Sequence, residues 1–494
     1  MIEQLGDAFS LFLTIENILI VFVGVVVGTV IGAIPGMTTP MGVALALPFT
    51  FTLPPVTGIL LLLGIYKGGL YGGSITAILI KAPGTPAASC TVLDGYPLTQ
   101  KGQARKALDM ALYASCFADF ISNLSLILLA GLLASFALKF GPPEFFTLIV
   151  FSLTIIAGVS GDSLPRGIAA AALGLIFATI GLDMVYGTGR FIFDEWQLMG
   201  GLNFIPVLIG LFALPEILRY FAGRFEETTR AAAMRGGGAT FAEFRRCFKS
   251  ILRGSLIGVV LGSIPGIGGA PSAFLSYSEA RRNSPDRDRF GKGELEGVAA
   301  AEAGNNGVAG ATMIPLLALG VPGDVITAVI LGAFMIHGLR PGPVMFEQNL
   351  TMIYALFIGI MLSSAYLFVV GKFSIRAISR IAEIPNRLLY PAVLILCLFG
   401  AYAINNSPFD VLVMLLMGLV GYAMMVFGLP APPFLIAFIL GPLLEDNFRQ
   451  SMILSEGSPS ILFRTPICWI FWAMTLASIL FSLKSRQRRT PLAG

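Results

Sequence analysis

Charged residues and histidine are scarce in this chain, and each scarcity excludes a class of protein. Only 12% of the 494 residues are charged, and there is a single histidine. Soluble proteins carry about 25% charged residues, so the low content indicates a protein that lies in a membrane. One histidine argues against a His-ligated metal site and against most histidine-dependent catalysis.

Several functional motifs are missing as well. No P-loop is present, and no Ser/His/Asp arrangement can be discerned, so ATP hydrolysis and triad chemistry lack support. The net charge is +4, without a basic stripe interleaved with aromatic residues, so we expect no nucleic-acid partner. The five cysteines form no C-x-x-C pair and are predicted to be packing thiols: Cys90, Cys116, Cys247, Cys397 and Cys468. We therefore expect no cofactor and no enzyme.

What the chain has in abundance is apolar sequence. Hydrophobic residues make up 56%, and the mean hydropathy is +0.84. A spanning helix needs roughly 20 apolar residues, because about 30 Å of hydrocarbon is crossed at about 1.5 Å per residue. The pattern predicts an all-α polytopic membrane protein with about 11–13 spanning helices. The candidate segments are 11–34, 58–80, 107–138, 145–160, 166–182, 202–222, 251–264, 297–319, 324–337, 352–372, 389–404, 410–428 and 466–483.

Three apolar stretches are also rich in proline and glycine, and these predict helix ends or unwound backbone. They are residues 35–55, 265–277 and 429–442. Such backbone is tolerated at membrane depth only when it is buried in protein or lines a water-filled cavity. Residues 1–10 hold no Lys or Arg, whereas a secretory signal begins with a basic region. The first apolar run, 11–34, is therefore predicted to be a retained helix.

A phrase of similar sequence ends an apolar run in each half of the chain. Residues 28–36 read GTVIGAIPG, and residues 258–266, at an offset of 230, read GVVLGSIPG. Further along, Pro83-Gly84 pairs with Pro322-Gly323 at an offset of 239, and residues 93–97 pair loosely with 336–338. Chance could produce one such phrase, but three in the same order favour an internal repeat. Paired segments interrupted by Pro and Gly are the sequence pattern that points to the binding site of a secondary transporter.

The repeat and the distribution of Lys and Arg predict the organisation of the chain. Residues 1–222 form a first membrane repeat, 223–250 a cytoplasmic linker, 251–483 a second repeat and 484–494 a basic cytoplasmic tail. The linker and a loop at 281–292 are basic, which places them inside the cell. Residues 183–201, with Trp196 as an interface anchor, and residues 445–456 are predicted outer loops. The N-terminus would lie outside, and the two repeats would be inverted.

Polar residues within apolar segments are the candidate site, because charge inside a bilayer is costly. Glu302, Asn305 and Asn306 share one face of a helix at spacings of three and four. They could line a site for a substrate or a hard cation, or form an interhelical polar clamp without a ligand; the two interpretations have equal weight. Asp324 follows a Pro-Gly turn, where it could cap a helix, and Thr85 takes the matching position in the first half.

If the Pro-Gly turns precede half-helices, their free N–H groups could bind an anionic carboxylate without any arginine. Structural kinks without a ligand are the alternative. The predicted substrate-binding residues are Pro35, Gly36, Thr38, Thr39, Gly73, Ser74, Pro83, Gly84, Thr85, Pro265, Gly266, Asn305, Asn306, Pro322, Gly323 and Asp324, and the candidate cation ligands are Glu302, Asn305 and Asp324.

Other ionisable residues have plainer interpretations. Lys67 and Lys81 flank a polar segment and could compensate a substrate's charge. We predict instead that each side chain extends to a membrane interface. Asp119 and Asn123 are predicted to form a buried hydrogen-bonded pair. His337 is predicted to be a satisfied structural histidine.

Seven phrases resemble a known family, the large membrane subunit of bacterial tripartite tricarboxylate transporters. They are residues 32–36, 64–74, 82–86, 93–97, 296–306, 319–323 and 335–343, in the family's order. The resemblance implies a secondary transporter of the bacterial inner membrane that takes up organic carboxylates, driven by a cation gradient, Na⁺ or H⁺. It also implies two partners, a small four-helix membrane subunit and a periplasmic solute-binding protein. Residues 37–40 are bulkier than residues 267–270, so the ligand is not fixed as a tricarboxylate.

The function that we expect is import of a small organic anion by alternating access. A passive anion channel or an export scaffold is the alternative, although a channel would favour a continuous polar stripe across the bilayer. An intramembrane enzyme would need a clustered acid/base set, which one histidine and scattered carboxylates do not supply.

Overall fold

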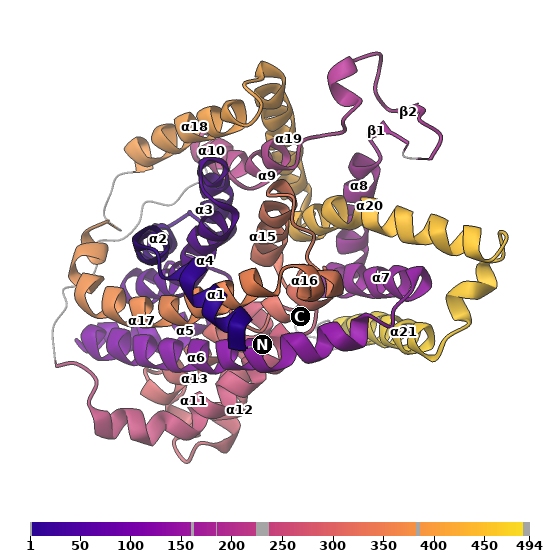
Figure 1. The fold of residues 1–494 in the computed structure, drawn as a ribbon. Coiled ribbons are helices and arrows are strands. Elements are labelled where there is room, and N and C mark those ends of the chain that lie inside the picture. Colours follow the sequence, from indigo (N-terminus) through magenta and orange to yellow (C-terminus); the bar gives the residue numbers. More distant parts are fainter. Residues whose placement is uncertain (1, 160–162, 184, 224–236, 382–385, 488–494) are drawn as a thin grey trace. The chain divides into compact units, whose positions relative to one another are not determined.

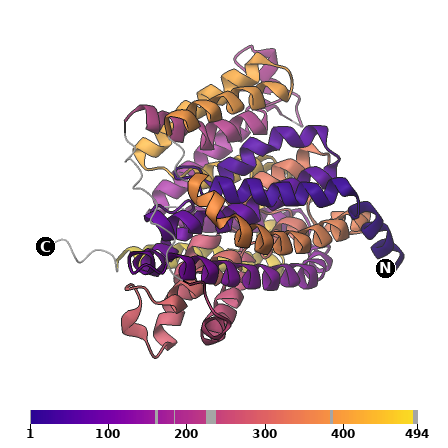
Figure 2. The same cartoon turned by 90° about the vertical axis from the view of Figure 1, so that its left-hand side faces the viewer.

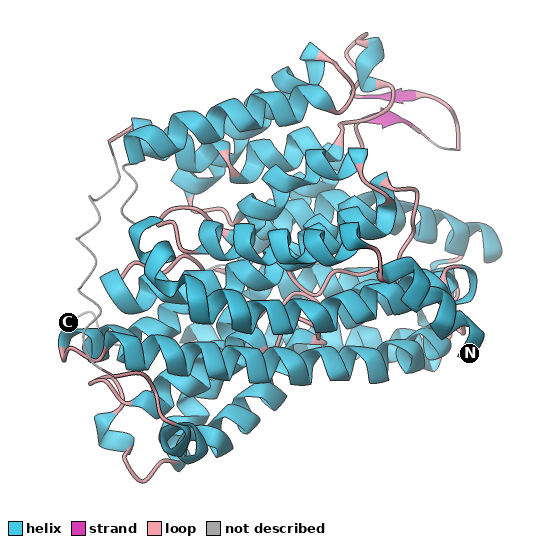
Figure 3. Cartoon of the chain, turned by 60° about the vertical axis from the view of Figure 1, so that its left-hand side comes forward, coloured by secondary structure: helices cyan, strands magenta, loops and turns pink. Residues whose placement is uncertain are grey.

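The computed structural model describes residues 2–159, 163–183, 185–223, 237–381 and 386–487, and its regular structure is overwhelmingly helical (Figures 1 and 3). The α-helices are α1 (Ile2–Phe12), α2 (Ile15–Gly32), α3 (Thr39–Ala46), α4 (Pro55–Ile80), α5 (Ala88–Gln100), α6 (Ala104–Ala137), α7 (Pro142–Val159), α8 (Leu164–Ala178), α9 (Phe204–Phe212), α10 (Leu214–Phe221), α11 (Phe241–Gly262), α12 (Gly269–Asn283), α13 (Leu295–Asn306), α14 (Met313–Leu319), α15 (Val325–Ile336), α16 (Pro343–Gln348), α17 (Leu350–Ile381), α18 (Asn386–Ala403), α19 (Pro408–Phe427), α20 (Ala431–Leu454) and α21 (Pro466–Gln487).

Short elements complete the described part. Four 3₁₀ turns are η1 (Leu47–Thr52), η2 (Trp196–Leu198), η3 (Arg287–Arg289) and η4 (Pro459–Phe463). The strands β1 (Gly181–Leu182) and β2 (Gly189–Arg190) pair antiparallel, with Gly181 opposite Arg190.

Within the described ranges, seven helical segments are long and apolar enough to cross a membrane. They are Ile15–Gly32, Pro55–Ile80, Ala104–Ala137, Pro142–Val159, Phe204–Phe221, Leu350–Phe373 and Pro408–Phe427. Five shorter apolar helical segments accompany them. The predicted class, an all-α polytopic membrane protein, is confirmed.

The chain forms two compact units, and both draw on separate stretches of sequence. The first unit contains Met1–Ala134, Arg219–Ile264 and Gly268–Gly400; the second contains Ser135–Leu218, Pro265–Ile267 and Ala401–Gly494. The predicted repeats, 1–222 and 251–483, therefore do not coincide with the compact units. The first unit takes its core from both halves of the sequence.

In the first unit, α4 is buried along almost its whole length and packs most closely on α2. A row of glycines allows this approach. A Cβ added to Gly28 would lie 2.2 Å from the Ile65 carbonyl oxygen, and one added to Gly32 would lie 2.4 Å from that of Gly69. Small residues are what membrane helices use to pack backbone against backbone. The helix α17 packs against both α2 and α4, and α2 and α17 run side by side in Figure 2.

The second copy of the phrase packs in the same manner. Gly254, Gly258 and Gly262 stand 230 residues after Gly24, Gly28 and Gly32. They face α13 and the turn after it, where a Cβ on Gly258 would lie 2.7 Å from the Cα of Gly307. The helices α11, α12 and α13 group together in Figure 1.

Turn conformations also match at the sequence offsets. Gly36 has φ +87° and Gly266 has φ +86°, and each follows a helix that ends four residues earlier. At the larger offset, α4 ends in a left-handed Lys81 (φ +60°) and α14 in a left-handed Gly320 (φ +71°). These equivalences support the internal repeat, while the inversion of its two copies stays a prediction.

The second unit is built from close helix pairs with their own glycine contacts. The helix α8 packs on α20, α7 packs on α21 and α20, and α9 packs on α19. A Cβ on Gly174 would lie 2.2 Å from the Phe434 carbonyl oxygen, and one on Gly210 would lie 2.4 Å from that of Met414.

Several expected boundaries are wrong. The first apolar run, 11–34, is broken at residues 13–14, where Thr14 caps α2. Most of the stretch 429–442, from Ala431 on, and most of the predicted outer loop 445–456 belong to one continuous helix, α20. Residues 269–277 begin α12 and are not unwound. Segment 297–319 is instead divided into α13 and α14, because the six residues between them form turns.

Part of the basic linker and tail cannot be compared with the structure. Arg224, Arg230, Arg235, Arg488 and Arg489 lie outside the described residues. The helix α11 begins at Phe241, so the last ten residues assigned to the linker are helical.

Lys81 provides a test of the repeat's turn geometry. Its left-handed backbone costs a residue with a side chain about 1 kcal/mol that glycine, as at the equivalent Gly320, does not incur. We expect Lys81→Gly to raise the midpoint of thermal unfolding in detergent. Lys101→Gly is the control, because φ at Lys101 is −78° and glycine brings no relief there. A lower midpoint for Lys81→Gly would show that the lysine side chain stabilises this turn.

Candidate functional site

The site begins with two Pro-Gly turns that meet at one point of α4. The N–H of Gly84 donates to the carbonyl oxygen of Gly73 at 3.2 Å. A Cβ on Gly84 would lie 2.0 Å from the Gly32 carbonyl oxygen and 2.9 Å from the Cα of Gly73. The end of α2, which leads into Pro35, therefore lies against the turn at Pro83-Gly84. Only glycines permit this three-way contact of main chains.

One face of α4 carries the next set of contacts. Tyr66, Gly69, Leu70 and Gly73 are three, four and seven residues apart, which places them on one side of a helix. The Tyr66 hydroxyl donates to Oδ2 of Asp324 at 3.0 Å and lies 3.1 Å from the Thr312 hydroxyl.

The other contacts on this face come from both halves of the sequence. A Cβ on Gly69 would touch the Thr39 side chain, and a Cβ on Gly73 would touch Thr85. Asn305 Nδ2 points to the Leu70 carbonyl oxygen at 3.5 Å.

Residues that follow the second Pro-Gly phrase reach the same group. Gly268, with φ +66°, has the Asp324 side chain 3.4 Å from its Cβ position. A Cβ added to Gly269 would lie 3.0 Å from Asn305 Oδ1. The helix α12 begins here without a side-chain cap. Main-chain N–H groups at this terminus are therefore close to two of the predicted site residues.

Asp324 combines two roles. It caps α15, because Oδ1 accepts from the Thr327 N–H at 2.8 Å, and the Thr327 hydroxyl completes a capping box. Its Oδ2 accepts from Tyr66. The predicted capping role is confirmed, and the link to α4 is an addition that the sequence did not indicate. Thr85 acts similarly in the first half, where its hydroxyl accepts from the Ala88 N–H at 3.2 Å.

Glu302 is the centre of a buried polar clamp. Its Oε1 accepts from the hydroxyls of Ser74, at 2.6 Å, and Thr91; its Oε2 accepts from Ser115 at 3.0 Å and Asn306 Nδ2 at 3.3 Å. The carboxylate is fully buried and joins α13 to α4, α5 and α6. Four donors occupy its acceptor sites, so in this conformation Glu302 anchors helices and presents no free oxygen to a cation.

Two buried oxygens at the site lack a hydrogen-bond partner. They are Oγ1 of Thr39 and Oδ1 of Asn305, on side chains that are 1% and 0% exposed. A buried polar atom left unpaired costs about 1–3 kcal/mol, so a ligand that meets these atoms would relieve that cost. Thr39 could donate to a carboxylate, and Asn305 Oδ1 could accept from a substrate hydroxyl or coordinate a cation.

Other predicted residues make different contacts. Pro265 and Gly266 belong to the second unit, where a Cβ on Gly266 would lie 2.1 Å from Ile156. Ser74 and Asn306 belong to the clamp around Glu302. The residues that lie together in the first unit are Gly73, Gly84, Thr85, Thr39, Asn305, Gly323 and Asp324, joined by Tyr66 and Thr312, which sequence reasoning missed. Tyr66 stands within a motif that the sequence had already singled out, but its role needed the fold.

Two of the plainer predictions for ionisable residues are wrong. Lys67 does not extend to an interface, because it is 2% exposed and forms an ion pair with Asp119 at 3.0 Å. Nε2 of His337 is buried without a partner, so this histidine is not satisfied. The predicted pair of Asn123 and Asp119 is confirmed at 3.2 Å. The cysteines are all free, as expected of packing thiols.

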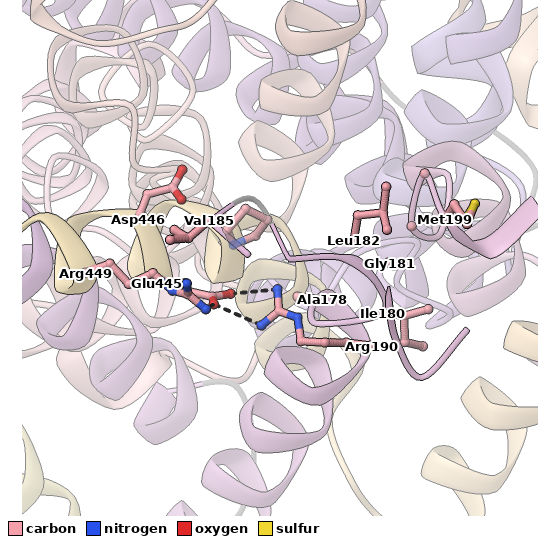
Figure 4. Close-up of a pocket in the computed structure, with 13 residues that line it drawn as sticks. Ala178, Ile180, Gly181, Leu182, Val185, Arg190, Met199, Glu445, Asp446 and Arg449 are labelled. Carbon is pink, nitrogen blue, oxygen red and sulfur yellow. Dashed lines mark hydrogen bonds and ion pairs between the residues drawn. The ribbon is translucent and has the colours of Figure 1, made fainter. Parts of the chain in front are cut away.

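The second unit contains a separate cavity of about 360 Å³ beside the β1–β2 hairpin (Figure 4). Arg190 forms a bidentate pair with Glu445 at 2.9 and 3.2 Å, and Arg449 bridges Glu445 to Asp183. Backbone N–H donation from Tyr186 and the Arg449 guanidinium lower the pKa of Asp183. These charges compensate one another and fix the hairpin to α20. The part of the chain that the structure describes has no cluster of three His, Cys, Asp or Glu suited to a metal.

Comparisons with known proteins point to one family. The model of the tripartite tricarboxylate transporter TctA family matches residues 18–436. An uncharacterized 52.8 kDa protein in the TAR-I ttuC′ 3′ region of Agrobacterium vitis is 36% identical over 483 residues, covering 98% of this chain and 96% of that protein. A second uncharacterized protein, in the TAR-II ttuC′ 3′ region, is 34% identical over 226 residues, which is 46% of this chain and 93% of that protein. No solved structure matches.

The close contact at Gly84 yields a stability prediction. A methyl group there would overlap the Gly32 carbonyl, and overpacking of this kind costs about 1–3 kcal/mol. We expect Gly84→Ala to lower the thermal unfolding midpoint in detergent. Gly131→Ala, which meets nothing within 4 Å and lies inside α6, should not lower the midpoint. Equal midpoints for the two variants would contradict the three-way backbone contact.

Proposed function

The chain belongs to the tripartite tricarboxylate transporter TctA family, and from this premise we propose that it imports a small organic carboxylate by cation-coupled alternating access. The family is the large subunit of a tripartite system, and the chain is a multi-pass membrane protein. We place it in the bacterial inner membrane, with the N-terminus outside and the C-terminus in the cytoplasm. Its partners would be a small four-helix membrane subunit and a periplasmic solute-binding protein that delivers the substrate.

The observation that carries the proposal is the convergence on one face of α4. Residues from both halves of the sequence meet there: Thr39 and Thr85 from the first, Asn305 and Asp324 from the second. The start of α12 at Gly269 brings main-chain N–H groups to the same place, and a helix N-terminus can bind a carboxylate without a cationic side chain. A site of this kind, formed at the junction of two repeats with interrupted helices, is typical of secondary transporters.

The negative charge of Asp324 constrains how an anion would bind. A carboxylate next to Asp324 needs a compensating positive charge, and a cation bound with the substrate would supply it. The unpartnered Oδ1 of Asn305 is available as one ligand for such a cation. This requirement favours coupled transport over a passive anion pathway, because the anion would bind well only when the cation is present.

Variants of two site residues test the location of the substrate. Asp324→Asn keeps one oxygen for the α15 cap, replaces the oxygen that accepts from Tyr66 with an amide NH2, and removes the charge. Asn305→Ala removes the unpartnered oxygen. We expect each to reduce uptake into proteoliposomes at least tenfold, while membrane insertion is retained. Asp410→Asn is the matched control, because Asp410 is also a buried carboxylate in the first turn of a helix, but in the second unit. Normal uptake by both site variants would mean that the substrate binds elsewhere.

The substrate class is tested through the delivery partner. We expect a thermal-shift screen of the cognate solute-binding protein to give its largest stabilisation with a di- or tricarboxylate such as citrate, because bound ligand stabilises in proportion to RT ln(1 + [L]/Kd). Uncharged sugars of similar size are the control. Stabilisation by sugars alone would contradict the proposed substrate. Flux through the assembled complex that needs no ion gradient would indicate a channel.

A further inference from the structure

A buried ion pair lies on a different face of the same helix turn as Tyr66, because Lys67 is the next residue of α4. Lys67 Nζ donates to Oδ2 of Asp119 at 3.0 Å, to Oδ1 of Asn123 at 2.9 Å and to the Ile360 carbonyl oxygen at 2.9 Å. These three acceptors account for all three hydrogens of an ammonium group. This set of acceptors suits an ammonium group, and its oxygens are supplied by α6 and α17.

Only one of the two carboxylate oxygens of Asp119 has hydrogen-bond partners. Its Oδ2 accepts from Lys67, from Asn123 Nδ2 at 3.2 Å and from the Ser364 hydroxyl. Its Oδ1 has no hydrogen-bond partner, although the side chain is only 1% exposed. A structural ion pair would be expected to satisfy both oxygens, because an unpaired buried oxygen is costly. The free oxygen can take up a proton while Oδ2 keeps its contact with Lys67.

The charge of the pair changes when Asp119 is protonated. With a carboxylate, Lys67 and Asp119 sum to zero; with a carboxylic acid, the pair carries one positive charge inside the membrane. That charge is unfavourable alone and favourable next to a bound anion. Lys67 directly follows Tyr66, whose hydroxyl contacts Asp324 in the proposed substrate site. The proton and the anionic substrate would therefore each favour binding of the other.

We propose that Asp119, paired with Lys67, is the proton-binding site that couples transport. Oδ1 of Asp119 takes a proton from a hydronium ion on the outer side, forming an O–H bond, and releases it to water on the inner side after the anion leaves. Lys67 stays protonated throughout and is a positioning residue. The inference rests on the proposed function, and it identifies the coupling cation as H⁺. The positive charge of the protonated pair would then compensate the substrate in place of a cation ligated by Asn305.

The neighbours of the pair are compatible with this role. The ionisable groups that act on it electrostatically are the Tyr66 hydroxyl on α4 and the Cys116 thiol on α6. From α17 the pair meets the Ile360 carbonyl and the Ser364 hydroxyl, neither of which titrates. From α2, Thr29 packs against Gly68, the residue after Lys67. Asp119 is thus the acidic side chain in direct contact with the ammonium.

Infrared difference spectroscopy during a pH titration tests the site without a substrate. The probe is the proton itself, with the purified full chain in lipid nanodiscs. We expect the carboxylic-acid band that appears on acidification to lose one component in Asp119→Asn. Asp109→Asn is the matched control and should keep the component that Asp119→Asn loses. Asp109 also joins α6 to a lysine of α17, Lys372, at 3.3 Å. An unchanged band in Asp119→Asn would overturn the proposal, whatever the transport result.

Transport by the complex tests the coupling. With radiolabelled citrate, or the acid that the screen selects, we expect accumulation driven by a pH gradient to fall at least tenfold in Asp119→Asn, while substrate exchange at equal pH persists. Asp119→Glu should restore part of the accumulation, and Asp109→Asn should behave as the unmodified chain. Loss of exchange in both Asp119 variants, or full accumulation by Asp119→Asn, would overturn the proposal. Failure of the unmodified complex under every ion gradient would instead refute the proposed function, and the infrared result would still decide the proton site.

Discussion

Close approach of helix backbones is the constraint on which the rest of the first unit depends. In lipid, water does not drive apolar helices together, so association rests on packing and on interhelical hydrogen bonds. The row Gly24, Gly28 and Gly32 lets α2 lie against α4 with no side chain between them. The same spacing recurs in α11 against α13. The Pro-Gly turns follow directly after these packed glycines, so the seams also hold the turns in place.

Polar contacts add the specificity that packing alone does not provide. Four hydrogen bonds to Glu302 join α4, α5 and α6 to α13, and they cross between the halves of the sequence. Replacing one partner would leave a buried carboxylate incompletely solvated, which is costly at this depth. The clamp therefore holds α4, α5, α6 and α13 together. The residues beside it that lack partners, Thr39 and Asn305, are the ones left for a ligand.

The helix α4 brings these features together. One side carries Tyr66 and Gly69 toward the proposed substrate site, the next residue carries the Lys67 ion pair, and Ser74 reaches the clamp. Binding at one of these groups can therefore change the charge and packing around the others, which lie one or two helical turns away on α4. This arrangement would give a physical basis for the proposed coupling of an anion to a cation, since both would act on the charge balance around a single buried helix.

The sequence by itself determined the class of protein, the repeated phrases and most helices, because hydropathy and Pro/Gly punctuation are local properties. It also gave Asp324 its cap and Asn123 its partner, since both depend on neighbours three or four residues away. It failed at α20, where the Pro- and Gly-rich stretch 429–442 predicted helix ends or unwound backbone, and at Lys67, where the partner lies 52 residues away in α6. Which acceptor oxygens are filled and which stay open was decided only by the tertiary structure. The reason is physical: Glu302 and Asn305 lie three residues apart on one helix, yet donors from three other helices reach the first and leave Oδ1 of the second unpartnered.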